Sequence, residues 1–204
     1  MERKLIILII IVLLLAAGGG VFYCLELQEK RPEKVLIREA VKYPTEEEWV
    51  IKETPEGKIV ENEKAGLKVR VPEGWKVEKF EIGSNEWSVG LSSPDAKLSE
   101  NKLYPIAGCG VGITVEYSKS DFEYIKGYLG IPEYLQSNKI EIIKVSEYLA
   151  SRETLGENPK LGQSVAVQVP VDNKVYVFDT FLIPDEKERC SQEFGKFLEG
   201  VVIK

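Results

Sequence analysis

The sequence contains no histidine. Imidazole is the usual proton carrier near neutral pH and the commonest neutral metal ligand in proteins. Its absence excludes Ser-His-Asp and Cys-His catalysis, His-based zinc sites and ordinary haem ligation. Three cysteines are too few for a four-cysteine zinc site. Neither a GxxxxGK[ST] phosphate loop nor a DxDxDG calcium loop occurs. We therefore expect no metal, no cofactor and no enzymatic activity.

The sequence also has fewer basic than acidic residues. The chain has 27 lysines and arginines against 33 aspartates and glutamates, a formal net charge of −6. Proteins that bind nucleic acid need a basic surface that neutralises phosphates. We therefore expect no nucleic-acid partner.

Charge is missing altogether from Leu5 to Leu25, directly after Arg3 and Lys4. About 20 apolar residues span the hydrocarbon core of a bilayer as a helix. The same layout, with small residues at 16–20, is also compatible with a cleaved signal peptide. The segment predicts either a single-pass anchor that contacts the lipid bilayer or a secreted protein. In both cases the rest of the chain is expected to lie outside the cytoplasm.

Cys24 stands at the end of this apolar segment. Attachment of a lipid would require small residues directly before the cysteine, but Val21, Phe22 and Tyr23 precede it. We interpret Cys24 as the outer end of the anchor. The expected organisation is an anchor over residues 1–27, a charged linker over 28–45 and one globular domain over 46–204.

Cys109 and Cys190 are the two cysteines of the expected domain. In an oxidising compartment they could form a disulfide that closes a loop of roughly 80 residues. Two separate buried thiols are the alternative, because sequence alone does not show that the side chains meet.

Alternation of apolar and polar residues predicts most of the domain to be β-strand. The pattern is clear in GLKVRV, EWSVGLSS, GVGITVEYS, IEIIKV and SVAVQVPV. KVYVFDTFLI is apolar on both faces, which is typical of a central strand. Asp172 and Asn173, just before it, predict a two-residue hairpin turn.

Two helices are expected to cover this sheet. Ser120 and Glu123 have the spacing of a capping box, which predicts a helix that begins there and ends before Pro132. A second helix is predicted from Asp185 to Leu198, with apolar residues on one face. Turns join most strands, so the fold class is α+β, with a mainly antiparallel sheet flanked by helices.

The segment GLKVRVPEGWKV, a strand that ends in Pro-x-Gly-Trp, resembles the opening of PsbP-like domains. The end of the chain is similar too: a strand, a closing helix and a short apolar tail. The resemblance implies an α/β/α sandwich and a non-catalytic role in support of a larger assembly. This sequence lacks the metal-binding histidines of some members, so no site residue is carried over. Trp75 of the motif is expected to be a core residue.

These observations favour an extracytoplasmic accessory or binding module for a protein assembly of the envelope. Two other functions stay open. One is a small-molecule or lipid-binding module, because Gly108, Gly110 and Gly112 surround Cys109 and glycines allow close approach of a ligand. The other is a hydrolase of the Ser/Lys type, which needs no histidine.

Overall fold

The computed structural model describes residues 40–98, 105–158 and 162–204. The expected anchor from Leu5 to Leu25, Cys24 and most of the expected linker lie outside these ranges. Within them, no helix is both long enough and apolar enough to cross a membrane. The described part has the predicted α+β class, with antiparallel sheets and a few helices.

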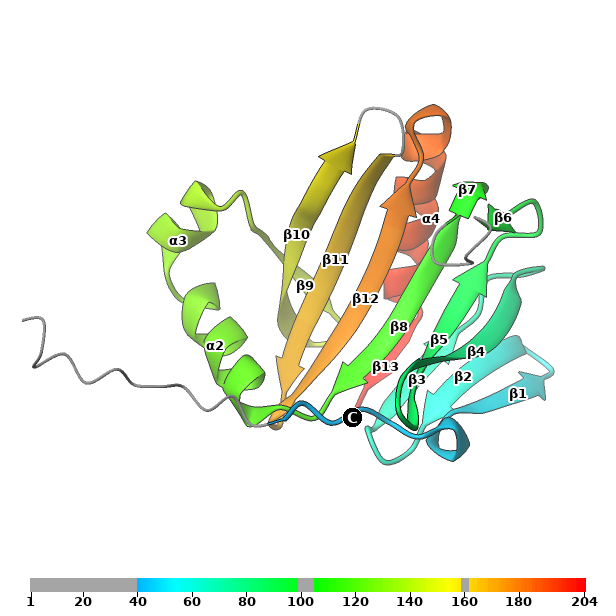
Figure 1. Cartoon of the computed structure of the whole chain (residues 1–204), viewed down its shortest axis with the longest axis horizontal. Helices are drawn as coiled ribbons and strands as arrows, with labels where there is room; N and C mark the ends of the chain where they lie inside the picture. The colour runs from blue at the N-terminus through cyan, green and yellow to red at the C-terminus, as the bar shows by residue number, and fades with distance from the viewer. Residues whose placement is uncertain (1–39, 99–104, 159–161) are drawn as a thin grey trace, which may run out of the picture. The chain divides into compact units, whose positions relative to one another are not determined.

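A seven-stranded antiparallel sheet forms the centre of the domain (Figure 1). Its strand order is β4-β5-β8-β12-β11-β10-β9. The strands are β4 (Lys76–Gly83), β5 (Glu86–Ser92), β8 (Gly110–Glu116), β9 (Glu141–Val145), β10 (Tyr148–Asn158), β11 (Gly162–Val171) and β12 (Lys174–Leu182). A two-stranded ribbon, β6 (Lys97–Leu98) with β7 (Pro105–Ala107), precedes β8.

Strand β12 is the middle strand of this sheet, as its apolar faces predicted. Val175 and Val177 point to one face, while Tyr176 and Phe178 are buried on the other. The turn before β12 has positive φ at both of its residues, 49° at position 172 and 60° at position 173. The predicted hairpin is therefore confirmed.

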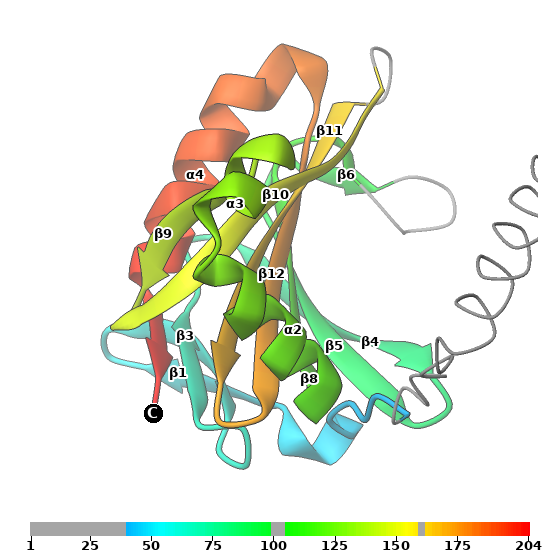
Figure 2. The same cartoon turned by 90° about the vertical axis from the view of Figure 1, so that its left-hand side faces the viewer.

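One face of the sheet is partly covered by two helices, α2 (Lys119–Leu129) and α3 (Pro132–Ser137) (Figure 2). Helix α2 begins two residues earlier than a cap at Ser120 would place it. Its N-cap is Ser118, which has extended backbone and accepts a hydrogen bond of 3.2 Å from the Asp121 amide. Ser120 lies inside the first turn, so its assignment as the cap was wrong. Helix α3 was not predicted.

The opposite face packs against helix α4 (Lys187–Glu199), which follows a short 3-10 turn, η2 (Pro184–Glu186). A second antiparallel sheet, β1-β2-β3-β13, packs on this side too. Its strands are β1 (Val50–Thr54), β2 (Gly57–Asn62), β3 (Leu67–Arg70) and β13 (Val201–Ile203). The largest side chains that are fully buried in the shared core are Trp49, Tyr176, Phe178, Phe194 and Phe197. This face therefore holds the main core.

The N-terminal end of the described chain runs along the domain. Lys42 pairs with Tyr117 in an isolated β-bridge, and the Trp87 amide donates to the Pro44 carbonyl at 2.8 Å. A 3-10 turn, η1 (Glu46–Glu48), then leads into β1. Residues 42 to 48 are thus held against the β5 and β8 side of the large sheet.

Candidate functional site

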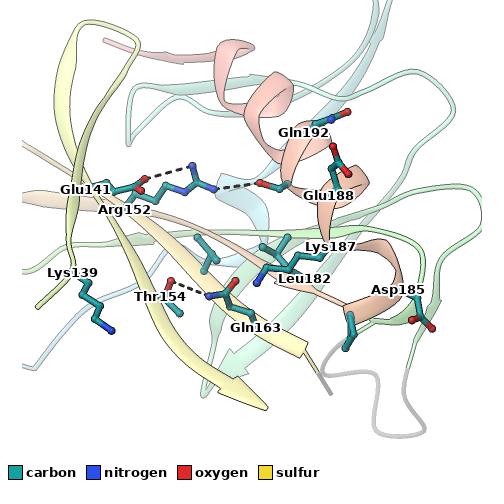
Figure 3. Close-up of a pocket in the computed structure, with 13 residues that line it drawn as sticks. Lys139, Glu141, Arg152, Thr154, Gln163, Leu182, Asp185, Lys187, Glu188 and Gln192 are labelled. Atoms are coloured by element: carbon teal, nitrogen blue, oxygen red, sulfur yellow. Dashed lines mark hydrogen bonds and ion pairs between the residues drawn. The ribbon is translucent and has the colours of Figure 1, made fainter. Parts of the chain in front are cut away.

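A groove lies between the start of α4 and strands β9 to β12 (Figure 3). Its volume is about 750 Å³, which is in the usual range for small-ligand sites. Buried Val165 and Leu182 line it together with polar side chains. Polar residues that line it include Glu141, Arg152, Thr154, Gln163, Lys187 and Ser191. We call this the α4 groove.

The alternation of strand β10 places Arg152 in the α4 groove. Its neighbours Ser151 and Glu153 point to the opposite face, where both hydrogen-bond the Tyr128 hydroxyl of α2, at 3.0 and 2.6 Å. Successive side chains of a strand point to opposite faces. Arg152 is therefore held on the α4 side, opposite Glu141 of β9 and Val167 of β11.

The contacts that Arg152 makes there with other described residues are long. Its guanidinium lies 3.7 Å from the Glu141 carboxylate and 3.5 Å from the Ser191 hydroxyl. The Arg152 side chain is 33% exposed and that of Glu141 is 69% exposed. A guanidinium normally pairs with a carboxylate through short, parallel hydrogen bonds. Arg152 therefore lacks such a close partner among the described residues.

The charges of the α4 groove balance. Arg152 is accompanied by two lysines and three carboxylates that also line the groove: Lys139, Lys187, Glu141, Asp185 and Glu188. Figure 3 shows Arg152 between β9 and α4, with Lys187 reaching in from the helix side. The groove as a whole is thus polar and close to neutral, with one half-buried cation between its walls.

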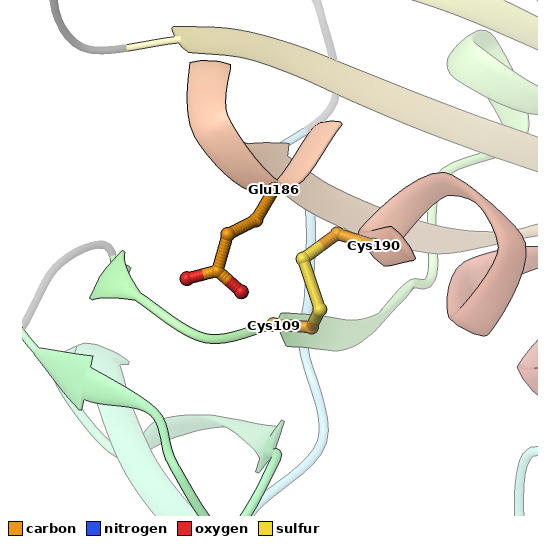
Figure 4. Close-up of side chains that lie close together, drawn as sticks. All are labelled: Cys109, Glu186 and Cys190. Carbon is orange, nitrogen blue, oxygen red and sulfur yellow. A yellow bond between two sulfur atoms is a disulfide. The ribbon is translucent and has the colours of Figure 1, made fainter. Parts of the chain in front are cut away.

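The wall formed by α4 is covalently attached to the large sheet (Figure 4). Cys190 of α4 is bonded to Cys109, which lies just before β8, and both residues are buried. The structure thus favours the disulfide over two separate thiols. Glu186 accepts a hydrogen bond of 2.9 Å from the Gly108 amide, and Arg189 pairs with Asp95 at 2.8 Å. The disulfide, the hydrogen bond and the ion pair therefore hold in place the first turn of α4, which lines the groove.

Glu186 lies close to both sulfurs, so these three residues could in principle hold a metal ion. The two sulfurs and a carboxylate oxygen lie within 4.8 Å of one another, which is close enough for one ion. Metal ions bind the thiolate form of cysteine. Two sulfurs joined in a disulfide have no thiolate to offer, so the oxidised pair is a structural crosslink.

The glycines around Cys109 make room for groups of the protein itself. Gly108 has a φ of +73°, and a Cβ there would lie 2.5 Å from the Ala96 Cα. A Cβ on Gly112 would lie 2.4 Å from the Asp179 carboxylate. Neighbouring protein atoms partly desolvate this carboxyl and raise its pKa above its ordinary value, although the residue is exposed. Close internal packing therefore explains these two glycines without a ligand.

Buried serines are the other candidates that the sequence left open. Ser88 bonds Thr114, Ser118 bonds Ser120, and Ser151 bonds Tyr128. Ser93 bonds Asp95 and the Cys109 amide. No hydrogen bond joins a serine to a lysine in the described ranges, so these residues provide no activated serine nucleophile.

A second depression, of about 920 Å³, surrounds the Pro-x-Gly-Trp segment. Trp75 is 7% exposed and belongs to the core, as expected. Three of the four cations that line this depression pair with carboxylates that also line it. The pairs are Lys58 with Glu53 at 3.3 Å, Arg70 with Glu56 at 3.3 Å and Lys196 with Glu193 at 2.9 Å. The α4 groove is the better candidate site, because Arg152 is two-thirds shielded from solvent and lacks so close a partner among the described residues, whereas Lys76 of the second depression is exposed.

The sequence analysis did not identify Arg152. Its strand, β10, was not predicted, and one arginine among 27 basic residues gives no signal of its own. Strand alternation would have been the informative signal. Arg152 stands between Ser151 and Glu153, so in a strand its side chain points to the face opposite to theirs.

No protein-family model and no curated protein matches the sequence. Solved structures with a similar backbone include a protein from Bacteroides thetaiotaomicron VPI-5482, with 10% identity and a TM-score of 0.44. This match covers 68% of the present chain but only 45% of the other. LpqN of Mycobacterium tuberculosis, which is involved in cell envelope biogenesis, has 15% identity and a TM-score of 0.42 over 68% of this chain and 83% of its own. PsbP (CyanoP) from Synechocystis sp. PCC 6803 has 13% identity and a TM-score of 0.40, over 77% and 93%. PsbP, which the Pro-x-Gly-Trp segment resembles, is thus among the solved structures similar to this chain.

Proposed function

We propose that this protein is a membrane-anchored, extracytoplasmic binding module that serves a protein assembly of the envelope without catalysing a reaction. One observation carries the proposal: the wall of the α4 groove is fixed by the buried disulfide between Cys109 and Cys190. Disulfides form and persist mainly in oxidising compartments, outside the cytoplasm. A fixed wall also lowers the entropy lost on binding, because the site is ordered beforehand.

The anchor in this proposal is the uncharged segment from Leu5 to Leu25. It would keep the domain at the membrane surface, where partners of an envelope assembly are concentrated. The partner is proposed to be a protein.

The test is co-purification of the tagged full-length protein from native membranes after an alkaline wash and gentle detergent extraction. We expect the protein to stay in the membrane pellet and a specific partner to elute with it. The variant Arg152→Gln should lose the partner. Arg70→Gln should keep it, because it removes a comparable Arg–Glu pair outside the α4 groove.

Two outcomes contradict the proposal in different ways. Release of the full-length protein into the alkaline wash would refute the anchor and indicate a cleaved leader. Repeated recovery without any partner would refute the accessory role.

A further inference from the structure

Among the described residues, Arg152 has fewer close hydrogen-bond acceptors than it has N–H donors. A guanidinium carries five N–H donors in a planar fork. The contacts of Arg152 with Ser191 at 3.5 Å and with Glu141 at 3.7 Å are both longer than an ordinary charge-assisted hydrogen bond of about 2.8 Å. Because two-thirds of the side chain is shielded from solvent, water replaces these partners only in part. A planar acceptor that came closer would therefore give the Arg152 guanidinium stronger hydrogen bonds than it has now.

Glu141 is easily replaced as the partner of Arg152. It lies on edge strand β9, its side chain is 69% exposed, and the two charges are separated by 3.7 Å. Exposed ion pairs of this kind contribute little to stability. The Glu141 side chain can therefore turn to solvent when another carboxylate approaches Arg152, and no buried charge is left unpaired.

The remaining surface of the α4 groove suits a peptide. Val165 and Leu182 are apolar and buried, so they can pack against an apolar side chain. Thr154, Gln163 and Gln192 carry hydroxyl and amide groups, which both donate and accept hydrogen bonds as peptide groups do. The balance of three basic and three acidic residues favours a singly charged group over a multiply charged phosphate.

We propose that the α4 groove binds a carboxylate-bearing peptide segment of the protein partner. The ligand carboxylate takes the place of Glu141 on the Arg152 guanidinium, and a neighbouring apolar side chain lies on Val165 and Leu182. This inference rests on the proposed function, since it places the segment on the partner of the module.

The experiment uses small probes that carry the two required groups. The full-length protein is reconstituted in lipid nanodiscs, and binding of N-acetylleucine is measured by ligand-observed NMR against empty nanodiscs. N-acetylleucinamide removes the charge, and N-acetylalanine removes most of the apolar side chain. The amidated peptide acetyl-Leu-Glu-NH2 moves the carboxylate from the chain end to a side chain, so it distinguishes the two peptide sources. Inorganic phosphate is added as a competitor.

We expect N-acetylleucine or acetyl-Leu-Glu-NH2 to bind in the millimolar range, and both controls to bind more weakly. Arg152→Gln should weaken binding by roughly tenfold or more, because a charge-assisted pair is lost. Arg152→Lys should give an intermediate loss, because the charge remains but the fork does not. Glu141→Gln should strengthen binding, because it removes the internal competitor. Arg70→Gln should leave binding unchanged.

Several results would overturn the inference: equal binding of the amide and the acid, full binding by Arg152→Gln, displacement by phosphate at matched concentration, or no binding of either carboxylate by the wild type. The rise expected for Glu141→Gln cannot arise from partial unfolding, so it separates a ligand contact from a structural role. The two proposals also fail separately. A partner retained by Arg152→Gln refutes the groove as its site but keeps the module, whereas a solitary purification refutes the module.

Discussion

The Tyr128 hydroxyl of α2 donates a hydrogen bond of 2.6 Å to the Glu153 carboxylate of β10. The same hydroxyl contacts Ser151 at 3.0 Å and Gln168 at 3.2 Å. Burial, followed by the bond to Glu153, raises the pKa of Tyr128, so the hydroxyl keeps its proton. This contact fixes the face of β10 that points to α2 and thereby the face that carries Arg152.

Tyr128→Phe should lower the free energy of unfolding by about 1–3 kcal/mol, because it leaves buried polar groups without their shared partner. Urea unfolding followed by circular dichroism measures the change. The control is Tyr124→Phe, which removes an exposed hydroxyl that bonds Tyr134 at 2.8 Å and should have little effect. Equal effects of the two variants would show that the network around Tyr128 does not stabilise β10.

Replacing Cys109 and Cys190 together by alanine should lower the free energy of unfolding by roughly 3–5 kcal/mol, because the bridge closes a loop with a sequence separation of 81 residues. Guanidinium unfolding without reductant compares this variant with the wild type. Cys24→Ala is the matched control, and it should not change the transition. Reductant should lower the stability of the wild type and leave the double variant unchanged.

Gly108→Ala should be strongly destabilising, because the left-handed backbone and the Ala96 backbone 2.5 Å away both oppose a Cβ. Strain in the backbone alone costs on the order of 1–3 kcal/mol. Gly127→Ala should do the opposite. Gly127 lies inside helix α2 with open space around its Cα, so alanine should raise helix stability by about 1 kcal/mol. Thermal unfolding distinguishes the two, and a tolerated alanine at 108 would contradict the packing described for this turn.

Asp179 should make stability depend on pH at the acid end. Neighbouring protein atoms partly desolvate this carboxyl, although the residue is exposed, and raise its pKa in the folded state above the ordinary value of 3.8. The folded chain therefore binds slightly more protons there than the unfolded chain. Stability should therefore fall as the pH rises through the interval just above 3.8. Glu116, whose pKa is raised by burial and then by Asp121, contributes with the same sign.

Asp179→Asn should reduce the loss of stability between acid and neutral pH. The loss that Glu116 contributes should remain. Urea midpoints measured between about pH 3 and 7 for both proteins test the difference. Curves of identical shape for the wild type and Asp179→Asn would show that the carboxyl is not perturbed in the folded state.

The strands with one wet face were predictable because burial on one side imposes alternation on the residues. Val111, Ile113 and Val115 follow this rule. Strand β12 was predictable for a different reason, because a run that is apolar on both faces is typical of a central strand. The β1 strand was not predicted, because four of its five residues are exposed and leave no alternation. The start of α2 was misplaced because Ser118 and Ser120 both suit a cap, and only the extended backbone at Ser118 decides between them.

The candidate site was less predictable than the fold. Sequence analysis singled out Cys109 and Cys190, since a pair of domain cysteines is conspicuous. The groove itself depends on Glu141, Arg152 and Ser191, which come from two strands and a helix. These residues come together because of the strand register and the position of α4. Neither of these produces a recognisable pattern in the sequence around the three residues.

Strand β13 has a consequence for the order in which the domain can be made. Val201–Ile203 pair with Leu67–Val69, so the last strand to be synthesised completes the second sheet. Until then, the edge of β3 is unpaired and part of the main core is uncovered. Such distant pairing delays folding, because a long loop must close first. The domain therefore reaches its final form only after nearly all of it has been synthesised.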